Sequence, residues 1–266
     1  TISFYNQQVE SVAAGAAIDM NLKKISWDRV PLKDVKRGKR YEVVETAYRV
    51  AHYRPFFKQA AYVDRQWNNT VYQLGQLFPT EHTTNQAIYI SGSGVSSPFA
   101  CLMTDELPDL HLLGDGPMLP RYRYESSSAN TAGQGAFSFE DGEEIDGFRR
   151  VENITDEALA QFQVAYKDQS ISKDDVFFYV YGVLHSTEYR ESFASDLKKQ
   201  LPRIPFLKQF RDFVEAGQQL SELHLKYETV ERYPLAGLDV EPLAAVPYLP
   251  DCCETQCLVM NGARTC

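Results

Sequence analysis

The chain has 266 residues, of which 44% are hydrophobic and 24% charged, a composition typical of a folded globular protein with room for a large core. The mean hydropathy is -0.37, and no run approaches the ~18 apolar residues of a membrane-spanning helix. The first residues lack the basic and apolar pattern of a secretion signal. We therefore expect a cytoplasmic protein with no membrane partner, and the net charge of -9 argues against a protein that coats nucleic acid.

Charge is distributed unevenly along the chain. Residues 21–65 contain 12 Lys and Arg against 5 Asp and Glu, a net of +7. Residues 134–266 contain 13 against 23, a net of -10. A basic segment on an acidic protein can decide where a polyanion docks. The alternative interpretation is that the cations between Lys33 and Arg40 form a solvated loop.

Strand patterns occupy the first half of the chain. Residues 41–56 place β-branched and aromatic residues at near-alternate positions, which predicts a strand. Shorter strands are predicted at residues 60–64, 87–91 and 99–103, the last two joined by a Gly/Ser/Pro-rich connection. Residues 125–147 are rich in Ser, Gly and acidic residues, which indicates a long surface loop.

Helical periodicity follows in the second half. Residues 155–168, 187–201 and 205–228 carry apolar residues at i, i+3 and i+4 steps. Ser172 and Asp175 form a predicted capping box that opens a helix with apolar residues on nearly all sides, so we expect that helix to be central and buried. The predicted fold is α/β (α+β), a mixed or antiparallel sheet followed by a bundle of amphipathic helices. The predicted regions are 1–150, mostly β; 151–235, helical; and 236–266, a loosely packed tail.

Motifs that carry catalysis are missing. The sequence contains no GxxxxGK[ST], GxGxxG, HExxH or GxSxG pattern. The five cysteines, four of them in the last fifteen residues, include no CxxC pair and do not resemble a disulfide framework. His111 and His224 each lie between leucines, which is typical of hydrogen-bonded core histidines. We therefore predict no catalytic residue, metal site or cofactor in this chain.

Four segments together resemble the C-terminal specificity region of type ISP restriction–modification enzymes, the single-polypeptide type I systems. They are KDDVFFYVYGVLHSTEYRESFASDLKKQLPRIPF (173–206), LSELHLKYETVERYPL (220–235), YRPFFKQAAYVD (53–64) and DLHLLGDGPMLPRYRYE (109–125). The four blocks occur in the order of the family and span about residues 50–235. Phe57 stands where the family usually has Asp, and the tail from Pro250 onward departs from the pattern.

This resemblance implies a non-enzymatic module that reads a short double-stranded DNA sequence. The parent polypeptide would contain an adenine methyltransferase, an ATP-dependent helicase or translocase and a nuclease, with S-adenosylmethionine, ATP and Mg as cofactors. Its methyltransferase and helicase domains would be the partners of this chain.

Phosphate contacts need Lys and Arg, whereas Asn and Arg can pair with base edges. The residues predicted to contact DNA are Arg49, Arg54, Lys58, Arg65, Asn68, Asn69, Arg121 and Arg123. Two alternatives from other classes stay open. One is a protein-interaction or scaffold domain without DNA binding, and the other is a hydrolase with an unrecognised site.

Overall fold

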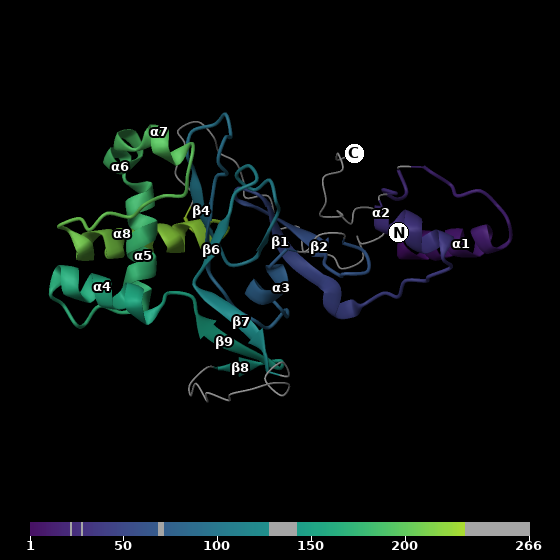
Figure 1. Ribbon diagram of the computed structural model, residues 1–266, viewed down its shortest axis with the longest axis horizontal. Coiled ribbons are helices and arrows are strands. Elements are labelled where there is room, and N and C mark those ends of the chain that lie inside the picture. The colour runs from purple at the N-terminus through teal and green to yellow at the C-terminus, as the bar shows by residue number, and fades with distance from the viewer. Residues whose placement is uncertain (22, 28, 69–71, 128–142, 232–266) are drawn as a thin grey trace. The chain divides into compact units, whose positions relative to one another are not determined.

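The computed structural model describes residues 1–231, apart from residues 22, 28, 69–71 and 128–142 (Figure 1). The described chain forms two compact units. Unit 1 contains Thr1–Val50 and Ala60–Tyr72, and unit 2 contains Ala51–Gln59 and the residues from Gln73 onward. The chain passes between the units within strands β1 (Tyr48–Arg54) and β2 (Phe57–Tyr62) and again after Tyr72.

Unit 1 is built on an aromatic core beneath two helices, α1 (Ile2–Ala13) and α2 (Arg29–Lys36), with a 3-10 turn at Glu45–Ala47. The Tyr5 and Tyr41 rings stack with their centroids 4.2 Å apart, and the Trp67 ring lies edge-on to both. The Tyr41 hydroxyl donates to the buried Asp34 carboxylate at 2.9 Å. Aromatic rings that pack edge-on or offset bury large apolar areas, so this small unit has a defined core.

The described strands form short sheets of three strands each. In the first, β1 lies between β2 and β5 (Leu107–Pro108), and β5 is parallel to β1. In the second, β3 (Ala87–Ile90) pairs antiparallel with β4 (Cys101–Thr104) and with β6 (Met118–Pro120). In the third, β9 (Phe148–Glu152) pairs antiparallel with β7 (Tyr122–Ser126) and β8 (Glu144–Ile145). A short helix, α3 (Leu74–Leu77), precedes β3.

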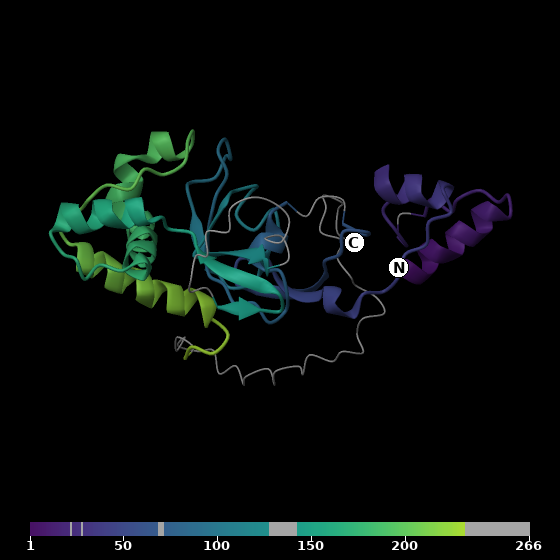
Figure 2. The same ribbon diagram turned by 60° about the horizontal axis from the view of Figure 1, so that its bottom comes forward.

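The helices of unit 2 surround a central one. They are α4 (Asp156–Tyr166), α5 (Lys173–His185), α6 (Thr187–Ser192), α7 (Ala194–Leu197) and α8 (Phe210–Leu225). Ser172 and Asp175 form the predicted capping box at the start of α5. Figures 1 and 2 show α5 crossing α8 on one side of the β3–β4 strands. Tyr179 and Tyr181 of α5 are fully buried in the core that this crossing closes.

The α/β fold class, with small mixed or antiparallel sheets and a helical bundle in the C-terminal half, is confirmed. The predicted strand 41–56 is shorter, because residues before Tyr48 are irregular or form the 3-10 turn. The predicted helix 187–201 is divided at Phe193 into α6 and α7. Helices α1 and α2 were not predicted, and α2 includes residues 33–36 of the segment considered as a loop, whereas residues 37–40 are non-helical. The predicted tail, residues 236–266, lies outside the described residues.

Candidate nucleic-acid interface

The β1–β2 hairpin presents Arg54 and Lys58 on either side of its turn, but both cations are already paired. The Arg54 guanidinium lies 2.9 Å from the Asp109 carboxylate and stacks 3.9 Å from the centroid of the Tyr53 ring. The Lys58 ammonium lies within 4 Å of the carboxylates of Asp105 and Glu106, and only 20% of its side chain is exposed. Because both cations contact the segment around β5, they attach the hairpin to the rest of unit 2.

The turn of this hairpin has an unusual backbone. Phe56 has a φ of 57°, a left-handed conformation that disfavours an aromatic residue. Its ring lies edge-on to His224 and Tyr227, which belong to the end of α8 and the residues after it. These contacts can offset a conformational cost of order 1–3 kcal/mol. The hairpin is therefore fixed at its tip as well as along its strands.

Arg121 joins the strand region to the start of the central helix. Its guanidinium forms a two-pronged ion pair with Asp174, in which Nε donates at 2.7 Å, and Nη1 donates to Gln86 at 3.2 Å. It also lies 5.7 Å from the centroid of the Phe178 ring, and only 19% of the side chain is exposed. This arrangement suits a structural clamp between β6–β7 and α5.

Arg123 is the more accessible of the two arginines near β7. Half of its side chain is exposed, and its nearest carboxylate, Glu125, lies 3.9 Å away. Exposure alternates along this strand, since Tyr124 is buried and Arg123 and Glu125 are exposed. On the neighbouring strand Arg149 pairs with Glu125 at 3.1 Å, so this surface carries both signs of charge.

The remaining predicted DNA contacts belong to unit 1. Arg49, on β1, is partly exposed, and Arg65, in the turn after β2, is exposed. Asn68 is buried; its side-chain oxygen accepts from the Asp64 backbone at 2.7 Å, and its amide nitrogen has no partner among the described residues. Asn69 lies outside the described residues. The structure therefore makes Asn68 a part of the turn itself.

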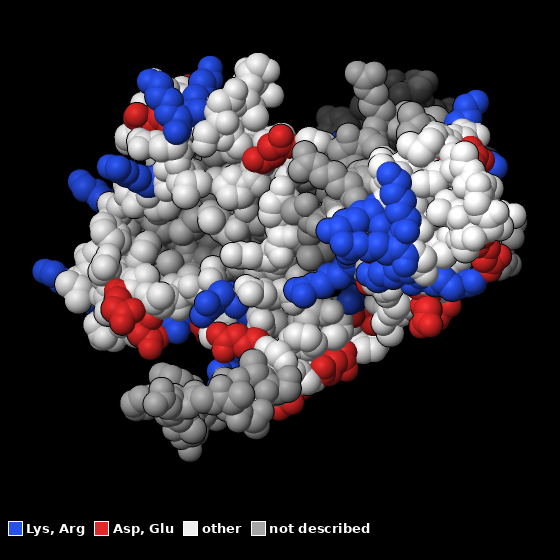
Figure 3. Space-filling model, turned by 45° about the vertical axis from the view of Figure 1, so that its right-hand side comes forward, with Lys and Arg blue, Asp and Glu red and all other residues white. Residues whose placement is uncertain are grey.

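Sequence reasoning missed an ordered group of cations on α2. Lys33 and Lys36 of α2 and Arg37, the first residue after the helix, are exposed at i, i+3 and i+4 positions, opposite the buried Pro31 and Val35. This periodicity was present in the sequence and could have predicted the helix. Figure 3 shows one large group of Lys and Arg side chains near the middle of the face drawn, with smaller groups elsewhere and with Asp and Glu side chains along its lower edge.

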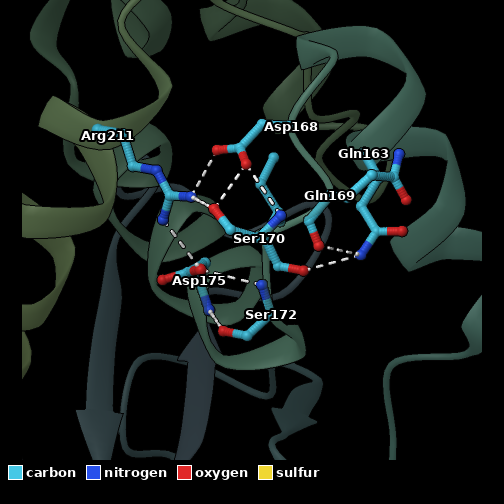
Figure 4. Close-up of polar contacts among 8 residues, drawn as sticks. Gln163, Asp168, Gln169, Ser170, Ser172, Asp175 and Arg211 are labelled. Carbon is cyan, nitrogen blue, oxygen red and sulfur yellow. Dashed lines mark hydrogen bonds and ion pairs between the residues drawn. The ribbon is translucent and has the colours of Figure 1, made fainter.

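A polar cluster fixes the start of α5 against α8 (Figure 4). Arg211 donates to Asp168 at 2.6 Å and to Asp175 at 3.0 Å. Ser170 and Arg211 donate hydrogen bonds to the Asp168 carboxylate and lower its pKa to about 2. Asp175 is also the capping residue of α5, so the cluster unites a helix start with the first turn of another helix. Its cations and carboxylates satisfy one another, which is typical of a structural brace.

A second cluster bears on the hydrolase alternative. The Cys101 sulfur lies 3.2 Å from His185 Nε2, an approach that resembles a nucleophile with its base. Burial, however, raises the pKa of the Cys101 thiol to about 11 despite the adjacent Arg190. Burial, with help from Arg190, also lowers the pKa of His185 to about 4. A catalytic cysteine needs a lowered pKa, so this pair has the properties of core packing.

The histidines differ from the prediction in one case. His224 is partly buried and hydrogen-bonded to Tyr181, as expected. His111 is exposed and pairs with Asp115, so its assignment to the core was wrong. Within the described residues, no group of three or more His, Cys, Asp or Glu side chains has the arrangement of a metal site. No helix in the described part of the chain has both the length and the apolar character to cross a membrane.

Comparison with protein families decides the relationship suggested by the four sequence blocks. The family model of the Type ISP C-terminal specificity domain matches residues 1–251. The chain belongs to this family. The match includes unit 1, so the Type ISP specificity domain reaches further toward the start of the chain than the four blocks indicated.

Solved structures resemble the Type ISP specificity domain over most of its length. One is the DrdV–DNA complex, with 34% identity over 92% of this chain and a TM-score of 0.75. A nuclease-deletion mutant of the Type ISP restriction–modification enzyme LlaGI, in complex with a DNA substrate mimic, has 33% identity over 88% and a TM-score of 0.69. The ATP-dependent Type ISP enzyme LlaBIII, bound to DNA, has 26% identity over 88% and a TM-score of 0.69.

The Type ISP specificity domain covers 22%, 20% and 14% of the lengths of these three chains. No curated protein matches it.

Proposed function

We propose that this Type ISP specificity domain recognises a short double-stranded DNA sequence on behalf of catalytic domains elsewhere in the same polypeptide. The proposal rests on the similarity of this chain, in sequence and in structure, to part of DrdV and part of LlaGI. Both are about one-third identical to this chain over nearly all of it, and both were solved with DNA or a DNA mimic. Conserved backbone geometry at that level supports a conserved role for the domain.

The pairing of the cations divides the predicted DNA contacts into two groups. Arg65 and Arg123 are exposed, and Arg49 is partly exposed, so phosphate groups can reach these side chains. We propose that these residues contact DNA. The other three cations form ion pairs with carboxylates inside the domain; they are Arg54, Lys58 and Arg121. These carboxylates would lose their partners if the cations bound DNA instead. Because leaving a partly buried charge unpaired is costly, we propose that these three position the elements that bear the contacts.

The chemistry of a parent enzyme would lie outside this chain. In the proposal, the methyltransferase that uses S-adenosylmethionine and the motor that uses ATP and Mg are separate domains, and the nuclease is another. The specificity domain contributes no catalytic group and acts in the cytoplasm. Its task is to set the register of the catalytic domains on the duplex through phosphate contacts and to choose the site through base contacts.

Selection from a randomised duplex pool tests the proposal. The full-length protein is incubated with the pool at low salt, the retained duplexes are sequenced over several rounds, and the affinity is measured by fluorescence anisotropy. We expect one short asymmetric sequence to be enriched, with an affinity that falls steeply as salt rises. A pool that stays random, together with salt-insensitive association with another protein, would instead support the scaffold alternative.

A further inference from the structure

The outer face of α2 is a cationic stripe held on a rigid support. Lys36 and Arg37 follow Lys33 by three and four residues, and Arg37 is the first residue after the helix. This spacing places both side chains next to that of Lys33, with Cβ atoms about 5–6 Å apart. On the opposite face of the helix, Val35 is completely buried in the core of unit 1. The orientation of the stripe is therefore fixed by packing.

The C-terminal end of α2 is closed by a Schellman motif. Gly38 has a φ of 73°, its N–H donates to the Val35 carbonyl at 3.1 Å, and the Lys39 N–H donates to the Asp34 carbonyl at 3.1 Å. This motif needs a left-handed residue after the helix, which glycine adopts without steric cost. The Tyr5 hydroxyl then donates to the Lys39 carbonyl, so the segment after the helix is fastened to α1.

The acidic groups around α2 are engaged with other partners. Asp34 points inward, where Lys39 lies 3.0 Å away and Tyr41 donates a hydrogen bond. Burial alone would raise the pKa of Asp34, but the hydrogen bonds from Lys39 and Tyr41, together with the charges of Lys39 and Arg37, outweigh burial and lower it, so the carboxylate stays charged. On α1, Glu10 pairs with Arg40 at 2.5 Å.

The three cations of the stripe, by contrast, make no side-chain hydrogen bond or ion pair with the described residues. This sets them apart from Arg54, Lys58 and Arg121, whose charges are satisfied inside the domain. Long flexible cations that lie next to one another, with no ion-pair partner among the described residues, suit a ligand that offers a row of equally spaced negative charges. The backbone of a duplex does so, with a phosphate every 3.4 Å of axis along each strand.

We infer that the outer face of α2 binds the phosphate backbone of DNA through Lys33, Lys36 and Arg37. This inference rests on the proposed function and adds a phosphate-binding surface to it. The stripe contributes the part of the DNA affinity that does not depend on base sequence. Charged contacts of this kind set the position of a protein on the duplex and speed its association.

The test compares two variants with the same change in net charge. One carries Lys33→Gln, Lys36→Gln and Arg37→Gln; the other carries Lys198→Gln, Lys199→Gln and Lys208→Gln at exposed positions of unit 2. Both are made in the full-length protein, and circular dichroism melting checks that they fold. Anisotropy then gives log Kd against log salt for a selected duplex and a scrambled one.

We expect the α2 variant to lower the salt slope by about 0.9 for each lost phosphate contact, about 2 to 3 in total, by the same amount on both duplexes. The unit 2 variant should keep the slope of the unmodified protein. The inference is wrong if the unmodified protein binds DNA and the α2 variant has the same salt slope. It is also wrong if the salt slope falls equally in both variants. A changed preference between the duplexes would also overturn it, because the stripe would then read bases. If the unmodified protein binds neither duplex, the proposed function itself fails.

Discussion

Gly182 of α5 and Gly217 of α8 face each other where the two helices cross. A Cβ atom on Gly182 would lie 2.2 Å from the Phe213 carbonyl oxygen, and one on Gly217 would lie 2.0 Å from the Phe178 carbonyl oxygen. The two backbones therefore approach more closely than any side chain would allow. This contact lets α5 bury its apolar surface against both α8 and the β3–β4 strands.

Alanine at either glycine should destabilise the domain. The small gain in helix propensity, about 0.5–1 kcal/mol, is outweighed by a clash with backbone that must be relieved by moving a whole helix. We expect Gly182→Ala or Gly217→Ala to cost about 2–3 kcal/mol of unfolding free energy, measured by urea denaturation. Gly75→Ala is the matched control, since a Cβ there meets no atom within 4 Å. A wild-type midpoint for Gly217→Ala would mean that the crossing is looser than described.

Alanine substitutions at Arg121 and Arg123 should have different effects, the first on the stability of the domain and the second on its affinity for DNA. Arg121→Ala removes a two-pronged ion pair and leaves Asp174 without its partner, so we expect a loss of about 1.5–3 kcal/mol of unfolding free energy. Arg123→Ala removes one distant exposed pair and should change stability by less than about 0.5 kcal/mol. On DNA, Arg123→Ala should weaken binding and reduce the salt slope by about 1. The assignment of roles would be reversed if Arg123→Ala unfolded the domain and left binding intact.

Lys167 offers a stabilising substitution. It ends α4 with a φ of 53°, in a Schellman arrangement in which the Asp168 N–H donates to the Gln163 carbonyl. A non-glycine residue in this conformation costs roughly 1–2 kcal/mol, so Lys167→Gly should raise the melting temperature by a few degrees. Gly38→Ala, at the equivalent position after α2, should lower it for the same reason. Two shifts of the same sign would contradict this account.

The stability of the domain should fall in mild acid because of His185. Burial lowers its pKa to about 4, whereas the unfolded chain binds that proton near pH 6.5. Between these values the unfolded state holds more protons, so the unfolding free energy decreases as the pH drops from 6.5 to 4, by at most about 3 kcal/mol. Urea denaturation across this range should show a shallower pH slope in His185→Gln than in the exposed-site control His82→Gln. Equal slopes in the two variants would show that His185 does not carry the effect.

Elements with local sequence signals could be predicted before the fold was known. The capping box of Ser172 and Asp175 and the periodicity of α4 and α8 depend on residues within a turn or two of one another. Strands β3 and β4 were equally clear, because turn-forming residues separate two short apolar runs. The family blocks also identified the relationship, since an ordered set of motifs survives divergence better than any one motif.

Contacts between distant segments determine which cations are available to bind a ligand. Arg121 and Arg123 are two residues apart and look equivalent in the sequence, yet Arg121 is held by a carboxylate 53 residues away and Arg123 is not. Arg54 is neutralised by Asp109 from a segment 55 residues further on. Ion pairing depends on which distant segments meet in space. The local pattern of charges in the sequence therefore cannot predict these pairs. The availability of a charge is therefore a property of the fold, whereas its presence is a property of the sequence.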